Sequence, residues 1–377
     1  MKKIVLFSLE AGVMGGVAGV NRVLCEMFRS MGYEVLPLYL RRGGEECFEG
    51  DVIRPDRNWS FTQGKKILSA LKRGRLFTAL RFSFCRLAEK RRYEEDCRRA
   101  RALLKRENPD LILTSHYLLP DAIPEELLSR TVHHVHTSFA ATAAVRADLE
   151  TLRRFNGKIR FLWLSEGICR EAEKFGFQNS DYLYNPLSAF PEKRSEAEKS
   201  QSVVIITRFS EEKRLPLAVA LLREAFDRLP DPFRYRVQIW GFGPEEAKIA
   251  EAIGNDSRFQ MMGRCSDPFA ALKEARLSIN TSRFEGFSLS ILESSAAGVP
   301  TVSFRFGEAA EEEILSGETG VLVPMDDRES FVQSLRDLLC EDETVEKMSR
   351  RAREYARRFT LEAVAEDWRS FFDSFWS

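Results

Sequence analysis

The sequence predicts an α/β protein of two doubly wound, Rossmann-like domains. Its 377 residues exceed what one hydrophobic core usually spans, and 44% hydrophobic with 30% charged residues is ordinary for a globular chain. Short apolar runs alternate with longer helical patterns, which is typical of parallel sheets covered by helices. The alternation stops at a polar segment, residues 191–201, and then begins again. We therefore expect one domain at 1–190 and a second at 191–359.

The first half of the chain predicts a set of parallel strands. Residues 3–8 form an apolar run, which is followed by a glycine-rich turn, a helical pattern near 20–31 and a second strand at 34–39. These elements make one βαβ unit. The further strands expected in this half are 111–114, 132–136 and 159–164.

The second half repeats the arrangement. Its expected strands, each separated by helical or polar stretches, are 202–207, 234–240, 277–280 and 299–303. Ligands of such sheets bind at the carboxyl ends of the strands, so two domains of this kind that face each other would form a binding cleft.

Cysteine usage and hydropathy indicate a cytoplasmic protein. The seven cysteines are scattered and none lies in a C-x-x-C pair, which argues against a disulfide framework and against a zinc site. The first seven residues resemble a signal peptide, but Glu10 interrupts the apolar run, and no stretch of 18 apolar residues occurs. We expect no membrane-spanning segment.

The net charge is zero, but residues 62–106 are strongly basic. This region holds fifteen lysines and arginines and four acids, a net charge of +11, and its apolar residues recur at helical spacing. Such basic helices suit an anionic membrane surface, at the inner face of the cell membrane, or a phosphate-bearing acceptor. A solvated helix face with a few ion pairs explains the same pattern. Nucleic acid is not an expected partner, because the chain lacks whole-domain basicity and a nucleic-acid-reading motif.

The first βα turn, residues 10–19, is rich in glycine without spelling G-x-G-x-x-G, because Met14 occupies the needed first glycine position. The second strand also ends in Arg41 and Arg42 rather than in an acid that could hold an NAD ribose. A dinucleotide enzyme is therefore disfavoured. Gly15 and Gly16 could still bring the backbone close to a phosphate or a sugar, or could serve only as a tight turn.

Two carboxylates, Glu285 and Glu293, lie eight residues apart in the segment 282–293. Glu285 comes before Gly286, at the expected N-terminus of a helix, where backbone N–H groups and the helix dipole favour phosphate. Glu293 lies about two turns further along that helix. One carboxylate could reach sugar hydroxyls and the other a ribose, as a sugar nucleotide requires. A surface loop before an ordinary core helix is the alternative.

Taken together, these segments resemble the motifs of family 4 retaining glycosyltransferases with the GT-B fold, and the resemblance covers nearly the whole chain. The form of segment 285–290, with Phe306, Gly307 and Glu308 downstream, looks most like members that build bacterial surface polysaccharides and teichoic acids from UDP-sugars. Ser288 stands where the family commonly has glycine. The matching segments are 15–16, 185–187, 203–213, 241–244, 285–293, 298–300 and 317–324.

The resemblance implies roles for particular residues on the donor side. Arg208 and Lys213 would hold the nucleotide diphosphate, Glu293 the ribose hydroxyls and Glu285 the donor sugar. Two cations and the amides at a helix N-terminus can offset the charge of the leaving group without a metal, and the chain contains no D-x-D signature. No metal and no cofactor are therefore expected. The other implied donor contacts are Gly15, Gly16, Gly286, Phe287, Ser288 and Leu289.

On the acceptor side, His136 matches a family position that lines the cleft, and His116 is a weaker candidate. His136 could instead be a hydrogen-bonded histidine at a strand end. The C-terminal helix, 360–377, is amphipathic and aromatic, and the family implies that it crosses back to the first domain.

The implied reaction moves a hexose or N-acetylhexosamine from a nucleotide sugar, a UDP-sugar by resemblance, to a cell-surface glycan or a lipid-linked or polymer acceptor, with retention of configuration. Two other classes remain open. The chain could be a catalytically silent glycosyltransferase-like partner or chaperone. It could instead be a sugar-nucleotide epimerase or a phosphorylase on a similar two-domain scaffold. Dependence on an acceptor separates these classes.

Overall fold

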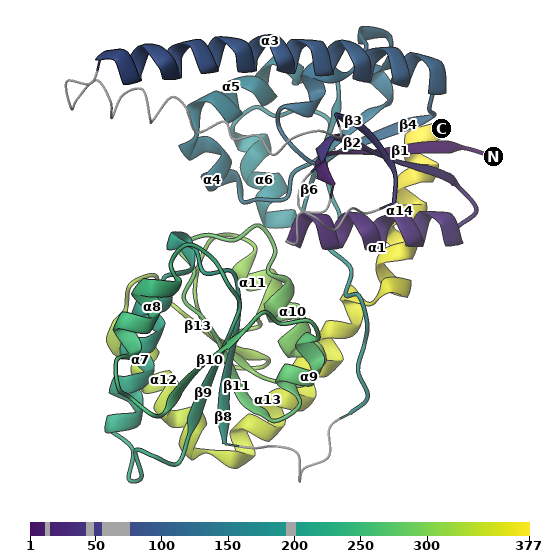
Figure 1. Cartoon of the computed structure of the whole chain (residues 1–377). Helices are drawn as coiled ribbons and strands as arrows, with labels where there is room; N and C mark the ends of the chain where they lie inside the picture. Colours follow the sequence, from purple (N-terminus) through teal and green to yellow (C-terminus); the bar gives the residue numbers. More distant parts are fainter. Residues whose placement is uncertain (12–15, 43–48, 55–75, 194–200) are drawn as a thin grey trace. The chain divides into compact units, whose positions relative to one another are not determined.

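The computed structural model describes residues 1–11, 16–42, 49–54, 76–193 and 201–377 (Figure 1). These residues form two parallel sheets, one in each half of the chain. The sheets confirm the predicted class of two Rossmann-like α/β domains. The described chain divides into two compact units, one of residues 1–136, 146–162 and 176–181 and one of residues 137–145, 163–175 and 182–377. The predicted boundary near residue 190 and the association of 360–377 with the first domain stay predictions.

The first sheet has seven strands in the order β3-β2-β1-β4-β5-β6-β7. Its central strands carry continuous apolar runs, as expected for strands covered on both faces. Val5, Phe7, Leu38 and Ile112 are fully buried in its core. The strands are β1 (Lys3–Ala11), β2 (Glu34–Arg42), β3 (Asp51–Arg54), β4 (Leu111–Thr114), β5 (Thr131–His134), β6 (Arg160–Trp163) and β7 (Ser180–Tyr182).

Helices and short 3₁₀ segments connect these strands. Ser165 and Ser138 cap α6 and α4 by accepting hydrogen bonds from the backbone N–H groups of Ile168 and Ala141. The connecting elements are α1 (Gly16–Ser30), α3 (Leu76–Glu107), η1 (Leu119–Ala122), η2 (Glu125–Arg130), α4 (Phe139–Ala144), α5 (Arg146–Phe155) and α6 (Glu166–Lys174).

The second sheet has six parallel strands in the order β10-β9-β8-β11-β12-β13. Helices α7, α8 and α12 lie together on one face, and α9 and α10 lie on the other (Figure 1). The strands are β8 (Ser202–Ile206), β9 (Arg236–Trp240), β10 (Phe259–Gly263), β11 (Ala275–Asn280), β12 (Thr301–Phe304) and β13 (Gly320–Val323).

The helical elements of this half follow the alternation expected from the sequence. Pro216 and Pro268 lie in the first turns of α7 and α9, where the missing N–H group costs no helical hydrogen bond. The elements are η4 (Glu211–Lys213), α7 (Leu215–Asp227), α8 (Glu246–Ile253), α9 (Pro268–Leu272), α10 (Leu289–Ala296), α11 (Ala310–Glu313), α12 (Arg328–Cys340), α13 (Asp342–Tyr355), η5 (Ala356–Phe359) and α14 (Leu361–Trp376).

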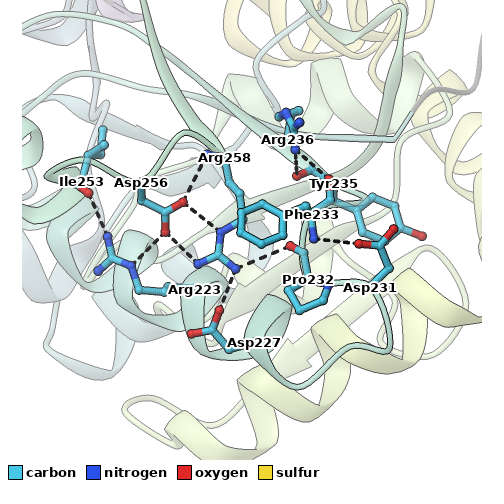
Figure 2. Close-up of polar contacts among 10 residues, drawn as sticks. All are labelled: Arg223, Asp227, Asp231, Pro232, Phe233, Tyr235, Arg236, Ile253, Asp256 and Arg258. Atoms are coloured by element: carbon cyan, nitrogen blue, oxygen red, sulfur yellow. Dashed lines mark hydrogen bonds and ion pairs between the residues drawn. The ribbon is translucent and has the colours of Figure 1, made fainter.

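A buried ion-pair network holds the β10 edge of the second sheet (Figure 2). The Arg258 side chain, 6% exposed, donates to Asp256 at 2.7 and 2.9 Å and to Asp227 at 2.7 Å. Arg223 donates to the same Asp256 carboxylate at 3.1 Å. These bonds, that from Arg258 first, hold the pKa of Asp256 below its usual range. The network fixes the end of α7 against the segment that leads into β10.

Replacing Arg258 by Met should lower the free energy of unfolding by about 3 kcal/mol at pH 7, because two carboxylates lose a largely buried partner. A carboxyl whose folded pKa is depressed contributes stability above its unfolded pKa and loses it as the pH falls. The deficit should therefore shrink below about pH 4. Urea unfolding at pH 7 and pH 3 measures both values.

The control is Arg351→Met, which removes two exposed ion pairs and should cost far less stability, because exposed pairs are weak. Equal losses in the two variants would contradict a structural role for the Arg258 network.

Candidate functional site

The candidate donor site lies at the carboxyl ends of β8 and β11 in the second sheet. The chain runs outward from β8 through β9 to β10 and then returns to the other side of β8 as β11. Strand order therefore reverses between β8 and β11, which is where open α/β sheets bind ligands. Arg208 and Lys213 follow β8, and Glu285 follows β11. The fold thus brings together residues that the sequence proposed separately.

Lys213 and Glu285 form a largely buried ion pair. The Lys213 Nζ atom lies 2.5 Å from Glu285 Oε1, and the side chains are 11% and 13% exposed. Ser282 Oγ donates to the same carboxylate oxygen at 2.6 Å. The Thr281 hydroxyl donates to the carbonyl oxygen of Lys213 at 2.8 Å, which further ties the two loops together. In this arrangement Glu285 balances the charge that Lys213 would offer to a phosphate.

Arg208 is accessible and pairs with Glu212, the residue that precedes Lys213 in the chain. Its side chain is 65% exposed, and its guanidinium donates to Glu212 Oε1 at 3.2 Å. Ser210 Oγ donates to the same oxygen at 2.6 Å. Since an exposed ion pair of this kind is weak, the guanidinium can exchange Glu212 for another anion at little cost.

The loop before α10 is anchored by Phe287. Its side chain is buried and its ring packs against the rings of Tyr184 and Phe359, with centroids 5.2 and 5.5 Å apart. The ring therefore belongs to an aromatic cluster, and Phe287 can offer a ligand only its backbone. Gly286 is half-buried in this loop, and Leu289 is the first residue of α10.

Glu293 lies on α10 and is half-buried. Burial, followed by the charge of Asp267, raises its pKa to about 8. Its carboxyl group makes no hydrogen bond to any described residue. The pKa of the Cys265 thiol is in turn raised to about 11, by burial first and then by Glu293, which places this carboxyl beside the loop that follows β10.

The loop after β9 contacts the loop after β8 through its backbone. Gly241 and Gly243 have φ of +144° and +154°, and a Cβ at either would collide with the carbonyl oxygen of Thr207 or Phe209. Only glycine permits this approach. The close packing of these two loops therefore explains the two glycines, whether or not a ligand contacts them.

The predicted residues of the first unit lie at the ends of its strands. His136 follows β5, burial lowers its pKa to about 4, and its Nε2 atom has no hydrogen-bond partner among the described residues. His116 follows β4, and burial, with the nearby Arg41 charge, lowers its pKa to about 4 as well. Both imidazoles are neutral at pH 7. Gly16 begins α1, and Gly15 lies outside the described residues.

Sequence reasoning missed Glu313, whose side chain is fully buried at the end of α11. Its Oε1 atom accepts a hydrogen bond from the backbone N–H of Ser288 at 2.8 Å. In the sequence it is the last of three consecutive glutamates, which suggests a solvated face. The available signal was its position three residues after Ala310 and one before Ile314, both buried.

The described part of the basic region, residues 76–106, forms most of α3. Four of its cations are exposed and make no ion pair to a described residue, namely Lys90, Arg91, Arg92 and Arg98; we call them the α3 cation patch. Arg99 and Lys105 instead pair with Glu95 and Glu126. Residues 62–75 lie outside the described residues.

In the described ranges no three His, Cys, Asp or Glu side chains gather so that they could hold a metal ion. Across the same ranges no helix is both long and apolar enough to cross a membrane.

Comparison with known proteins connects the second half of the chain with glycosyltransferases. Residues 200–341 match the family described as "Glycosyl transferases group 1". An exopolysaccharide phosphotransferase of Streptomyces coelicolor is 27% identical over 46% of this chain and 18% of its own length. The poly(glycerol-phosphate) alpha-glucosyltransferase of Bacillus subtilis is 28% identical over 44% of this chain and 24% of its own length. The chain therefore spans less than a quarter of these two relatives.

Longer matches agree in fold. The N-acetyl-alpha-D-glucosaminyl L-malate synthase of Bacillus anthracis is 24% identical over 71% of this chain and 75% of its own length. A mutant of TarM from S. aureus, in complex with fondaparinux, alpha-GlcNAc-glycerol and UDP, superposes with a TM-score of 0.75 at 13% identity over 99% of this chain and 100% of its own. Sucrose-phosphate synthase of Thermosynechococcus elongatus superposes with a TM-score of 0.75 at 15% identity, covering 100% and 99%. Together the structural matches show the two-domain fold.

The raised pKa of Glu293 predicts a pH-dependent cost in stability. The folded protein holds this proton more tightly than the unfolded chain, so the free energy of unfolding falls as pH rises from about 4.5 to about 8. Glu293→Gln removes this loss. Its stability relative to wild type should rise across that window by at least about 1.4 kcal/mol, the equivalent of one pKa unit.

Urea unfolding between pH 5 and pH 9 measures the difference. The control Glu246→Gln changes an exposed carboxyl on α8 and should show no such trend. A flat difference for Glu293→Gln would mean that this carboxyl is ionised in the folded protein.

Proposed function

We propose that this chain is a retaining, metal-independent glycosyltransferase that moves a hexose or N-acetylhexosamine from a UDP-sugar to a cell-surface glycan, lipid-linked or polymer acceptor. The observation that carries the proposal is the convergence of Lys213, Glu285 and the accessible Arg208 at the carboxyl ends of β8 and β11. The two cations at this sheet edge fit the diphosphate of a nucleotide sugar, and the carboxylate beside them fits the hydroxyls of its sugar.

The donor diphosphate would lie between Arg208, Lys213 and the N-terminus of α10. Both side chains carry positive charge, and the helix N-terminus adds backbone N–H donors and the positive end of its dipole. As Lys213 turns to the phosphate, Glu285 is released to accept hydrogen bonds from hydroxyls of the donor sugar. Glu293, further along α10, would bind the ribose. Such preorganised charge stabilises the leaving diphosphate as its bond to the sugar breaks.

In the proposed reaction the acceptor hydroxyl attacks the anomeric carbon on the face from which the diphosphate leaves. A new glycosidic bond forms as the bond to the phosphate oxygen breaks, and that oxygen takes the hydroxyl proton. Glu285 positions the sugar in this scheme. The neutral imidazoles of His136 and His116 can accept or donate a hydrogen bond without adding charge, which suits contacts to an uncharged acceptor.

The names of the relatives support the class of substrates. A glucosyltransferase acting on poly(glycerol phosphate) and a structure holding UDP both match this chain. We infer from them a UDP-sugar and an acceptor of the bacterial surface.

The α3 cation patch supports peripheral association with an anionic membrane from the cytoplasmic side. Lys90, Arg91, Arg92 and Arg98 are exposed close together on one helix, and Leu87 beside them is 52% exposed. Each such cation contributes about 1 kcal/mol near anionic lipid. A lipid-linked acceptor would be presented at that surface.

Calorimetry with UDP-, GDP- and ADP-sugars tests the donor site. We expect one sugar nucleotide to bind, and we expect Arg208→Ala and Glu293→Ala to weaken that binding at least tenfold. Glu285→Ala should lower turnover by about 10²–10³, far more than it changes the affinity for the nucleotide, because Glu285 acts on the sugar during the reaction. NMR of the anomeric proton in the product reports retention.

The control is Lys248→Ala, an exposed lysine on α8 that should leave binding and turnover unchanged. Binding of no sugar nucleotide would favour the silent-partner alternative. Release of an isomerised sugar nucleotide without an acceptor would favour the epimerase.

Co-sedimentation with vesicles tests the membrane proposal. The variant Lys90→Gln/Arg91→Gln/Arg92→Gln/Arg98→Gln should bind vesicles containing phosphatidylglycerol at least tenfold more weakly than wild type, and added salt should weaken wild-type binding. The control variant Lys248→Gln/Lys347→Gln/Arg350→Gln/Arg351→Gln removes four cations elsewhere. Equal binding of both variants, or equal wild-type binding to phosphatidylcholine alone, would refute the role of the patch.

A further inference from the structure

Glu313 lies where the candidate donor site meets α10. Its side chain has no exposed surface, and its Oε1 atom accepts from the backbone N–H of Ser288, the residue that caps α10. Its Oε2 atom is equally buried and has no hydrogen-bond partner among the described residues. A buried polar atom without a partner destabilises the folded protein, so its presence here points to a role other than stability.

The bond to Ser288 determines which amides α10 leaves for an anion. The N–H groups of Ile291 and Leu292 donate to the Ser288 carbonyl oxygen, and Glu313 takes the N–H of Ser288. The N–H groups of Leu289 and Ser290 donate to no described residue. These two amides therefore remain at the positive end of the helix.

Charged or titratable groups lie near Glu313 on four elements: η4, the loop before α10, α11 itself, and α13, which contributes Tyr355. Burial raises its pKa well above the usual range; the Ser288 N–H bond and Lys213 of η4 oppose this, while Glu285 of the loop before α10 and the adjacent Glu312 add to it. The Glu312 carboxylate already accepts a hydrogen bond from the Tyr184 hydroxyl at 2.8 Å. Ionisation of Glu313 would place a second negative charge beside Glu285, at the helix end where an anion is to bind.

We propose that Glu313 is a positioning residue. As a neutral carboxylic acid it accepts the hydrogen bond from the Ser288 N–H and leaves the amides of Leu289 and Ser290 to a diphosphate. When Glu313 ionises, it weakens diphosphate binding. The inference rests on the proposed donor site and adds to it a residue that controls when the site accepts an anion. The proton leaves to solvent and no other bond changes.

Isothermal titration of UDP, GDP and ADP into the full-length protein between pH 6.5 and pH 9 tests this role. Wild type should bind one of them at least tenfold more weakly at pH 9 than at pH 6.5. Glu313→Gln keeps an acceptor for Ser288 but cannot ionise, so its affinity should fall at least fivefold less over the same range. The nucleotide and Glu293 titrate in the same way in wild type and in Glu313→Gln. The ratio of the nucleotide affinities of the two proteins therefore reports the effect of Glu313 alone.

Two further variants separate positioning from folding. Glu313→Leu removes the acceptor for the Ser288 N–H and should weaken binding about tenfold at every pH, with thermal melting used to verify the fold. Glu311→Gln changes an exposed carboxyl on the same short helix and should follow wild type.

The outcomes distinguish failure of the Glu313 inference from failure of the proposed function. Equal pH dependence in wild type and Glu313→Gln overturns the inference while leaving the donor site intact, and so does wild-type affinity in a folded Glu313→Leu variant. Binding of none of the three nucleotides by wild type overturns the proposed function and this inference with it.

Discussion

The ion pair between Lys213 and Glu285 is the interaction on which the candidate site depends. It joins the loop after β8 to the loop after β11, and its side chains are largely withdrawn from water. A lone charge at such a place is costly, so each residue holds the other in position. The same pair defines how the site can change. Under the proposed function, a phosphate that drew Lys213 away would compensate its charge and leave Glu285 available for sugar hydroxyls, which would couple donor binding to sugar positioning.

The three carboxyl groups near α10 differ because their surroundings differ. Glu285 has a lysine and a serine hydroxyl as partners, which suits an ionised carboxylate. Burial raises the pKa values of Glu293 and Glu313, and neither has a cation bonded to it among the described residues. Burial therefore disfavours further negative charge near α10, beyond the Glu285 carboxylate that Lys213 already balances. This arrangement preserves the positive end of the helix for an anion.

The central strands could be predicted from sequence and the edge strands could not. Strands β1, β2, β4, β5 and β6 of the first sheet, and β8, β9, β11 and β12 of the second, are apolar runs flanked by neighbours on both sides. The four strands missed, β3, β7, β10 and β13, form the outer edges of the two sheets. Most edge strands are only half covered, so polar residues interrupt their runs, as in β3 and β7. The short run of β13 follows a glycine turn and resembles a loop.

The sequence by itself determined the alternation of strands and helices, the polar break between the halves and the spacing of Glu285 and Glu293, because these follow from local periodicity and from residues near each other in the chain. Only the tertiary structure decided that Lys213 meets Glu285, 72 positions away. It also decided that Glu313 is buried against Ser288, 25 positions away, and that Phe287 packs among aromatic rings. Strand order controls these contacts, since placing β11 beside β8 brings distant loops to one edge, and no local pattern encodes which strands become neighbours.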